Sequence, residues 1–268
     1  MARQSNPTTS EANGRLWGAR AQDWADVQEA VHRPLYEAVL AKTNVNSGTS
    51  YFDVGCGSGM AAQMARALGA EVSGLDAAAD LLHIARTRTP SAKLHRGDLE
   101  KLPFADNTFD VVTGFNSFQY AGNLEGALWE ARRVTKDDGW VAVVVWGRPD
   151  GMEAAEIVSA LKPFMPAPPP GAPGPFALSN EDALHQFAIN AGLNPAEIFD
   201  VECPFCYPNV STAVRGQSSS GVARKAAEFS SDQAVEDAYK RVSTKFLQPD
   251  GSVRINARFL CLLARLQT

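Results

Sequence analysis

The sequence lacks the features of membrane-spanning, secreted and nucleic-acid-binding proteins. Its longest uninterrupted apolar run covers residues 140–146, far short of the roughly 20 residues that cross a bilayer. Residues 1–10 have no apolar stretch typical of a signal peptide. Four cysteines give no secreted disulfide framework, and the formal net charge of −5 gives no electrostatic footprint for nucleic acid or an anionic membrane. These absences predict a cytoplasmic protein that binds neither nucleic acid nor membrane.

Strand-like and helix-like segments alternate through the first half of the chain. Short apolar runs predict strands at 51–54, 71–76, 93–95, 109–115 and 140–146, and helical periodicity predicts helices between most of them. This alternation is typical of a parallel sheet with helices on both faces. Later alternating runs predict two further strands, at 199–207 and 253–263.

The remaining segments are less regular. We expect a mobile tail at 1–12, a helix at 14–29 and another beginning at Pro34. Residues 165–175 are too rich in proline for a helix or strand and predict a rigid extended connection or a mobile flap. Helical patterns at 222–229 and 232–246 follow a loose Ser- and Gly-rich stretch and fall outside the strand–helix alternation.

A glycine-rich turn links the first strand directly to a helix. Gly55, Gly57 and Gly59 allow backbone angles and close approaches that a Cβ atom would block, and the free N–H groups of the next helical turn favour a negative or polar ligand group. A dinucleotide-binding turn needs Gly or Ala at the sixth position from Gly55, where Met60 stands. The spacing therefore argues against a dinucleotide.

Four motifs then occur in the order found in a known enzyme family: Asp53–Gly59, Gly74–Asp76, Gly97–Leu99 and the run from Pro103 to Val112. Over residues 45–147 the chain resembles the class I S-adenosylmethionine-dependent methyltransferases, in particular the small-molecule, type 11-like members. The resemblance implies an α/β fold, a three-layer Rossmann-like sandwich whose seven-stranded, mostly parallel sheet has an antiparallel last strand. It also implies N-terminal lid helices, a helical cap insertion, and S-adenosyl-L-methionine as methyl donor with S-adenosyl-L-homocysteine as product.

The resemblance further implies a division of the chain. The cofactor-binding core would be 46–147, completed by a helix and sixth strand at 179–207 and a terminal strand at 251–268. The other segments would lie over one sheet edge as lid and substrate pocket. They are the tail and lid helices at 1–45, a proline-rich flap at 148–178 and a cap insertion at 208–250.

Cofactor roles follow from the same resemblance. Asp53 would order the glycine turn and the ligand's amino group, Asp76 would accept hydrogen bonds from the ribose hydroxyls, and Asp98 would accept one from the adenine amino group. The full expected set is Asp53, Gly55, Cys56, Gly57, Gly59, Asp76, Ala77, Asp98, Leu99, Asn116, Ser117, Arg20 and Trp24.

Arg20 belongs to this set for a separate reason. It lies on an apolar helical stripe with Trp17 and Trp24, where a cation needs an explanation. Either its stem packs on the tryptophans while its head reaches water or a carboxylate, or it faces the carboxylate of the ligand. The sequence leaves both possibilities open.

Methyl transfer from a sulfonium is an in-line displacement, so positioning supplies most of the rate and a base is optional. Gln119 and Tyr120 are candidates for orienting the acceptor, and His32 and Glu153 are candidates for removing its proton. Each also has a structural explanation, His32 as an exposed helix residue and Glu153 as a solvated acid near a helix start.

An aromatic group near the fourth and fifth strands has two possible roles. Phe115, Phe118, Tyr120 and Trp146 form either a wall for an apolar acceptor or part of the core, and strand alternation favours the core for Phe115.

Two classes of function remain. The first is an enzyme that methylates a small, apolar or aromatic metabolite at oxygen, nitrogen or carbon, as a monomer or homodimer. The alternative is a non-catalytic S-adenosylmethionine-binding scaffold or sensor. No metal site is expected, because Cys203 and Cys206 would point to opposite faces of a strand. Comparing the binding of S-adenosylhomocysteine and NAD would separate the methyltransferase from an NAD-dependent protein.

Overall fold

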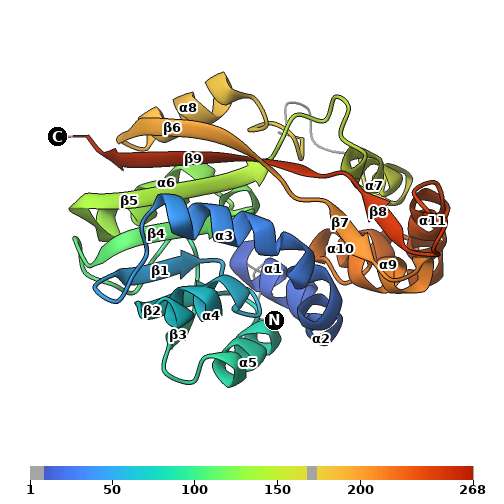
Figure 1. Ribbon diagram of the computed structural model, residues 1–268, viewed down its shortest axis with the longest axis horizontal. Coiled ribbons are helices and arrows are strands. Elements are labelled where there is room, and N and C mark those ends of the chain that lie inside the picture. Colours follow the sequence, from blue (N-terminus) through green and yellow to red (C-terminus); the bar gives the residue numbers. More distant parts are fainter. Residues whose placement is uncertain (1–8, 168–173, 268) are drawn as a thin grey trace, which may run out of the picture.

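The computed structural model describes residues 9–167 and 174–267. Its main sheet has seven strands in the order β3-β2-β1-β4-β5-β9-β6 (Figure 1). Strands β1 to β5 are parallel, and β9 runs antiparallel to both β5 and β6. The expected mostly parallel sheet with an antiparallel last strand is confirmed. The strands are β1 (Ser50–Val54), β2 (Glu71–Asp76), β3 (Lys93–Arg96), β4 (Phe109–Phe115), β5 (Thr135–Trp146), β6 (Leu193–Glu202) and β9 (Arg258–Leu266).

Helices cover both faces of this sheet. The face-covering helices are α3 (Arg33–Lys42), α4 (Met60–Ala67), α5 (Ala79–Arg88), α6 (Leu124–Val134) and α8 (Glu181–Asn190). Strand β1 shows why both faces of the sheet need helices packed against them. Tyr51 packs with side chains of α3 and α4, whereas its neighbour Phe52 packs with side chains of α6 and α8. Alternate β1 side chains therefore belong to different buried clusters, as the pleat of a strand requires.

The last two strands extend beyond the sheet as a two-stranded arm. The expected strand at 199–207 is interrupted after Glu202, and the expected strand at 253–263 is interrupted at Asn256 and Ala257. Beyond these breaks the chain forms a small antiparallel sheet from β7 (Phe205–Tyr207) and β8 (Val253–Ile255). Proline at 204 has no N–H to continue the ladder, which accounts for the first break. The arm carries the chain away from the sheet, to the right in Figure 1.

Between β7 and β8 in the sequence, the chain forms three helices that we call the cap. It consists of α9 (Val210–Gln217), α10 (Gly221–Phe229) and α11 (Asp232–Thr244). The two later helices match the sequence expectation closely, but α9, which precedes the expected loose stretch, was not expected. Its start carries a signal in the sequence, because the Asn209 side chain caps the helix by accepting a hydrogen bond from Thr212 N at 2.8 Å.

The N-terminal segment lies between the sheet and the cap (Figure 1). The expected single helix at 14–29 is wrong. Helix α1 (Thr9–Gly18) begins inside the expected tail, and Arg20 then has a non-helical backbone (φ −131°). The chain continues through α2 (Ala21–Asp23), a π-helical turn (Trp24–Gln28) and a 3₁₀ turn (Glu29–His32) into α3. The start of α3 beside Pro34 agrees with expectation.

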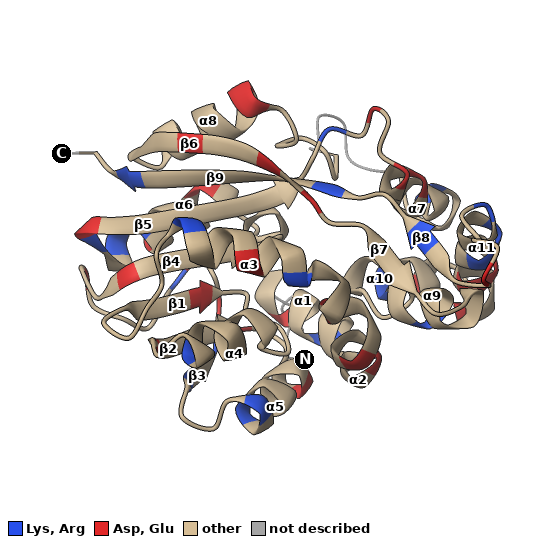
Figure 2. Ribbon diagram, viewed as in Figure 1, with Lys and Arg blue, Asp and Glu red and all other residues tan. Residues whose placement is uncertain are grey.

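Ion pairs join the N-terminal segment to the cap. Arg20 pairs with Asp232 and Glu236 of α11, Arg215 of α9 pairs with Asp23 and Asp26, and Arg15 pairs with Glu228 of α10. Figure 2 shows charge of both signs spread over the visible face. Most of these pairs are exposed, so each contributes at most about 1 kcal/mol.

A more buried ion pair joins the same segment to the core. Glu29, which is 3% exposed, pairs with Arg88 at the end of α5 and accepts a hydrogen bond from Met60 N at 3.1 Å. Arg88 also donates to the carbonyl oxygens of Ala25 and Ser58. Glu29 therefore places a carboxylate at the N-terminus of α4, where the helix dipole favours negative charge.

Two further segments complete the described chain. Helix α7 (Ala154–Ala160) and a 3₁₀ turn (Lys162–Phe164) follow β5, so much of 148–167 is helical. Part of the proline-rich run, 168–173, lies outside the described residues, as does most of the expected N-terminal tail. Within residues 9–167 and 174–267, no helix is both long and apolar enough to span a membrane.

Candidate functional site

One large cavity opens at the carboxyl ends of the parallel strands. Its wall has two parts that differ in origin. The strand-edge half follows β1, β2, β3 and β4 and comprises Gly55, Gly57, Asp76, Ala77, Leu81, Gly97, Asp98, Leu99, Glu100, Asn116 and Ser117. The aromatic half comes from the N-terminal segment, the ends of β4 and β5, α7, the proline-rich run, the arm and the cap. It comprises Trp24, Gln28, His32, Leu35, Tyr36, Phe115, Trp146, Ile157, Val158, Leu161, Pro175, Phe205, Gln217, Ser220, Val222 and Tyr239. Helix α1 and the turn after β4 complete the wall with Thr9, Ser10, Asn13, Trp17, Tyr120 and Ala121.

Because its glycines have no side chains, the glycine turn lets neighbouring groups come close to its backbone. Gly55 and Gly57 have φ values of 79° and 53°, which L side chains rarely adopt. A Cβ atom on Gly55 would lie 2.5 Å from the Ser117 Cβ atom. The Ser117 hydroxyl is buried and has no hydrogen-bond partner among the described residues. The turn and Ser117 thus leave a polar, tightly fitted corner of the cavity.

Asp76 holds the turn and the next helix together. Its Oδ2 atom accepts a hydrogen bond from Gly57 N and its Oδ1 atom accepts one from Ala78 N, both at 2.8 Å. Burial raises the pKa of Asp76, and these backbone donors partly oppose the shift. A carboxylate has further lone pairs, so this side chain can accept hydrogen bonds from a ligand as well.

The loop after β3 supplies a second acidic group. Asp98 Oδ1 accepts a hydrogen bond from Glu100 N at 2.9 Å, and Glu100 Oε1 accepts from Gly122 N and Asn123 N. Glu100 also lines the cavity, although the sequence argument did not select it. Its position two residues after Asp98, on the same loop, is the signal that could have found it.

Asn116 stands at the junction of the two halves. It has a left-handed φ of 50°, and its Oδ1 atom accepts a hydrogen bond from Gln119 Nε2 at 2.8 Å. Gln119 does not line the cavity, so its contact with Asn116 supports a positioning role. Tyr120 does line it, with its ring edge-to-face against Trp17 at 5.4 Å. Burial raises the pKa of Tyr120 to about 12.

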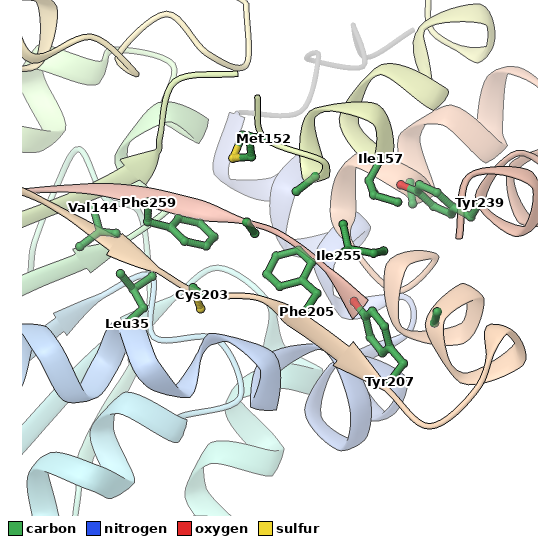
Figure 3. Packing of buried hydrophobic residues seen from close by; sticks show 14 of the residues in the cluster. Leu35, Val144, Met152, Ile157, Cys203, Phe205, Tyr207, Tyr239, Ile255 and Phe259 are labelled. Atoms are coloured by element: carbon green, nitrogen blue, oxygen red, sulfur yellow. The ribbon is translucent and has the colours of Figure 1, made fainter. Parts of the chain in front are cut away.

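The aromatic half is apolar and largely buried. Phe115 and Trp146 both line it, whereas Phe118 is buried in the core against Gly114. Phe115 takes both of its expected positions, because it packs against buried clusters of the core while its strand ends at the cavity. Figure 3 shows buried side chains running from Val144 and Phe259 in the sheet, along the arm, to Tyr207 and Tyr239 near the cap.

His32 is a buried group of this half. The expected exposed helix position is wrong, since only 8% of the residue is exposed. Its ring stacks on Trp24 at 5.9 Å and meets Phe205 and Phe259 edge-on. Its Nδ1 atom lies 3.1 Å from the Gln28 carbonyl oxygen. Burial lowers the pKa of His32 to about 4, so the imidazole is neutral at pH 7.

Several expected site residues lie outside the cavity wall. Cys56 is buried in the turn, and a Cβ atom on Gly59 would lie 2.8 Å from Ala85, so Gly59 allows α4 to pack on α5. Arg20 pairs with the cap because the helix breaks beside it. Glu153 accepts a hydrogen bond from Asn256 N at 2.6 Å, which ties α7 to the arm. The ligand contacts expected of these residues stay predictions without support from their placement.

Asp53 is also absent from the wall. It lies beneath the glycine turn, where its Oδ1 atom accepts a hydrogen bond from Thr113 Oγ1 at 3.0 Å. Burial raises the pKa of Asp53 to about 7, and the Thr113 hydrogen bond opposes the shift. Its expected role in ordering the turn stays a prediction.

The residues that the sequence argument missed belong mainly to the aromatic half. Gln28, Tyr36, Ile157, Gln217 and Tyr239 all line it. They come from segments that are remote in sequence and meet only through the arm and cap, so no local motif marks them.

Residues 52–143 match the family described as a methyltransferase domain. The malonyl-acyl-carrier-protein O-methyltransferase of Pectobacterium atrosepticum is 32% identical over 123 residues, 46% of this chain and 49% of that protein. The 2-phytyl-1,4-naphtoquinone methyltransferase of Synechocystis is 37% identical over 133 residues, 46% of this chain and 56% of that protein. The first curated relatives, uncharacterised mycobacterial proteins, are 28% identical, and the chain spans 65% of their length.

Solved structures agree with the fold. The YcgJ protein of Bacillus subtilis superposes with a TM-score of 0.59 at 18% sequence identity, covering 88% of this chain and 99% of that one. This likeness reaches well beyond residues 52–143. Residues 52–143 therefore match a methyltransferase domain, and the sheet order and the glycine turn with its following acids agree with a class I S-adenosylmethionine-dependent enzyme.

Proposed function

We propose that the protein transfers the methyl group of S-adenosylmethionine to a small, apolar or aromatic acceptor. The observation that carries this proposal is the continuous cavity, in which a polar strand-edge half opens into an aromatic half. One compartment suits a nucleoside with a charged amino acid tail, and the other suits an apolar molecule.

The residues of the strand-edge half fit the methyl donor. Asp76 would bind the ribose hydroxyls, Asp98 and Leu99 would bind the adenine, and Gly55 and Gly57 would pass close to the amino acid portion. The unpartnered Ser117 hydroxyl supports this fit, because a buried polar atom without a partner costs about 1–3 kcal/mol unless a ligand satisfies it. When bound, the donor would supply an electrophilic methyl group beside Asn116.

One of the two named relatives supports a small acceptor of low polarity. One relative is named for a naphthoquinone and another for a malonyl group on a carrier protein. Trp24, Phe115, Trp146 and Phe205 give this cavity the flat apolar walls that suit the former better. The wall excludes water and holds the acceptor in line with the methyl group, and such orientation can supply up to roughly 7–11 kcal/mol of the barrier reduction.

Calorimetric titration with S-adenosylhomocysteine and with NAD tests the donor. We expect binding of the first and none of the second, and the reverse result would overturn the proposal. Transfer from isotope-labelled S-adenosylmethionine to a panel of aromatic alcohols, amines and quinols then tests the reaction. Tight donor binding without transfer to any acceptor would instead support the non-catalytic sensor.

A further inference from the structure

The aromatic half contains a hydrogen-bond acceptor with nothing to accept from. His32 Nδ1 faces the carbonyl oxygen of Gln28 at 3.1 Å. A carbonyl can only accept, so Nδ1 carries the proton in the neutral imidazole, and Nε2 then has a free lone pair. Among residues 9–167 and 174–267, no hydrogen bond reaches Nε2, although the ring lines the cavity.

A donor without a partner lies in the same half. Gln217, at the end of α9, is only 3% exposed. Its Oε1 atom accepts a hydrogen bond from Ser243 Oγ at 3.2 Å. Its Nε2 atom makes no hydrogen bond of good geometry within the described parts of the chain, although it lies close enough to the Tyr207 hydroxyl to lower the pKa of that group. Burial raises the pKa of nearby Tyr207, and the amides of Gln28 and Gln217 partly offset this. The Tyr207 hydroxyl itself donates to Gln28 Oε1 at 2.9 Å.

These two groups make complementary demands on one ligand. Nε2 of His32 requires a donor such as a hydroxyl, and Nε2 of Gln217 requires an acceptor such as a ketone. Two of the rings around His32, those of Trp24 and Phe205, line the cavity and require the rest of the ligand to be flat and apolar. A fully apolar ligand would leave both polar groups buried and unsatisfied.

We propose that the acceptor is a neutral hydroxylated aromatic ketone or quinone-like molecule whose hydroxyl donates to His32 Nε2 and whose second oxygen accepts from Gln217 Nε2. This inference rests on the proposed methyl transfer and names its substrate class. The hydroxyl oxygen is the atom methylated, and His32 is the group that receives its proton.

The step balances without any further reactant. The acceptor oxygen forms a bond to the methyl carbon, the sulfur keeps the electron pair of the broken C–S bond, and the hydroxyl proton passes to Nε2. A weak base suffices, because the hydroxyl becomes a strongly acidic oxonium as the new C–O bond forms. The lowered pKa of His32, about 4, keeps Nε2 unprotonated and ready at neutral pH.

Ionisable groups near His32 do not supply a competing charge. Tyr36 on α3, Cys203 before β7 and Tyr207 on β7 are buried, and burial raises the pKa of each, so all three are neutral at pH 7. The adjacent Glu29 is paired with Arg88. The state of His32 is therefore set mainly by burial.

Equilibrium binding to the full chain saturated with S-adenosylhomocysteine tests the assignment. The probes are 6-hydroxy-1-tetralone, its 6-methoxy ether and 1-tetralone, which differ only at the hydroxyl. We expect the hydroxy compound to bind about tenfold more tightly than the other two, the value of one hydrogen bond of roughly 1.4 kcal/mol. Equal affinities, or no binding of any probe, would overturn the proposal.

Variants identify the two groups separately. His32→Phe keeps the ring packing and should abolish the preference for the hydroxy compound, whereas His32→Gln, whose amide oxygen can accept, should restore part of it. Gln217→Leu should weaken the binding of 6-hydroxy-1-tetralone. It should not change the affinity for 5,6,7,8-tetrahydro-2-naphthol, which lacks the ketone. A preference that survives in His32→Phe would contradict the assignment.

The donor titration keeps the two proposals apart. Each variant is first titrated with S-adenosylhomocysteine, which should bind as in the unsubstituted protein because His32 and Gln217 belong to the aromatic half. Failure of that titration in the unsubstituted protein would defeat the proposed function. Normal donor binding together with equal affinities for the three tetralone probes would defeat only the acceptor assignment.

Discussion

The two halves of the cavity differ in how the chain builds them. Every residue of the strand-edge half lies between 55 and 117 and follows a strand of one parallel sheet, where backbone geometry fixes its position. Residues of the aromatic half come from positions 24 to 239 and meet because the N-terminal segment and the cap close on each other. The strand-edge half is therefore held in place by the core, and the aromatic half by contacts between the N-terminal segment and the cap. Variants that act on one half and spare the other test this division.

The largest expected effect is the loss of stability on breaking the ion pair that joins the N-terminal segment to the core. Arg88→Ala leaves Glu29 buried without its partner at the start of α4, so we expect a loss of about 3–5 kcal/mol in unfolding free energy. Urea denaturation measures it. Arg215→Ala, which breaks exposed pairs between α2 and the cap, is the matched control and should cost no more than about 1 kcal/mol. Similar losses in both variants would contradict a buried link.

Asp76→Ala should weaken donor binding and spare binding in the aromatic half, although it also removes the hydrogen bonds that Asp76 accepts from Gly57 N and Ala78 N. Losing charge-assisted hydrogen bonds to the ribose should cost about 2–4 kcal/mol, or about 30- to 1,000-fold in affinity for S-adenosylhomocysteine. Calorimetry gives the dissociation constant, and His32→Phe serves as the comparison from the other half. If both variants weakened the donor equally, the division of the cavity would be wrong.

Gly55→Ala should damage the glycine turn in a way that strain alone does not explain. Gly55 and Gly151 both have positive φ values, 79° and 75°, but only a Cβ atom on Gly55 meets another residue, Ser117, at 2.5 Å. Both substitutions should lose about 1–2 kcal/mol from backbone strain. Only Gly55→Ala should also weaken S-adenosylhomocysteine by more than about tenfold. Thermal denaturation and calorimetry on both variants decide it.

The smallest expected effect is a pH dependence of the unfolding free energy, which arises from Asp53 next to the glycine turn. Burial raises the pKa of Asp53 to about 7 in the folded chain, well above the usual value for an aspartate. The folded state therefore holds a proton that the unfolded state releases, and the stability that this provides is complete below pH 4 and lost as pH rises through 7. We expect stability to fall by about 1 kcal/mol per pH unit between pH 5 and 7. Asp53→Asn should flatten this slope, and an unchanged slope would count against a raised pKa.

The sequence predicted the strand-edge half because its logic is local. Parallel strands end at a common edge, so a motif after each strand places Gly55, Asp76 and Asp98 together without knowledge of the rest of the fold. The same reasoning identified the sheet and most of its helices.

Arg20 and His32 show where this reasoning stopped. Helical periodicity placed Arg20 on a stripe with the tryptophans, but the helix breaks beside Arg20 and the side chain turns to Asp232 and Glu236. His32 was expected at the surface, whereas Phe205 of the arm and Phe259 of β9 pack over it. Both outcomes depend on residues more than 170 positions away in the sequence, and periodicity within one helix carries no information about them.

The central claim is that the donor's sulfur lies where the two halves meet. A crystal structure with S-adenosylhomocysteine and 6-hydroxy-1-tetralone tests it most directly. The account predicts the ribose hydroxyls on Asp76, the sulfur beside Asn116, and the tetralone among Trp24, His32 and Phe205 with its hydroxyl directed at the sulfur. A nucleoside bound in the aromatic half, or a sulfur turned away from the tetralone, would contradict it.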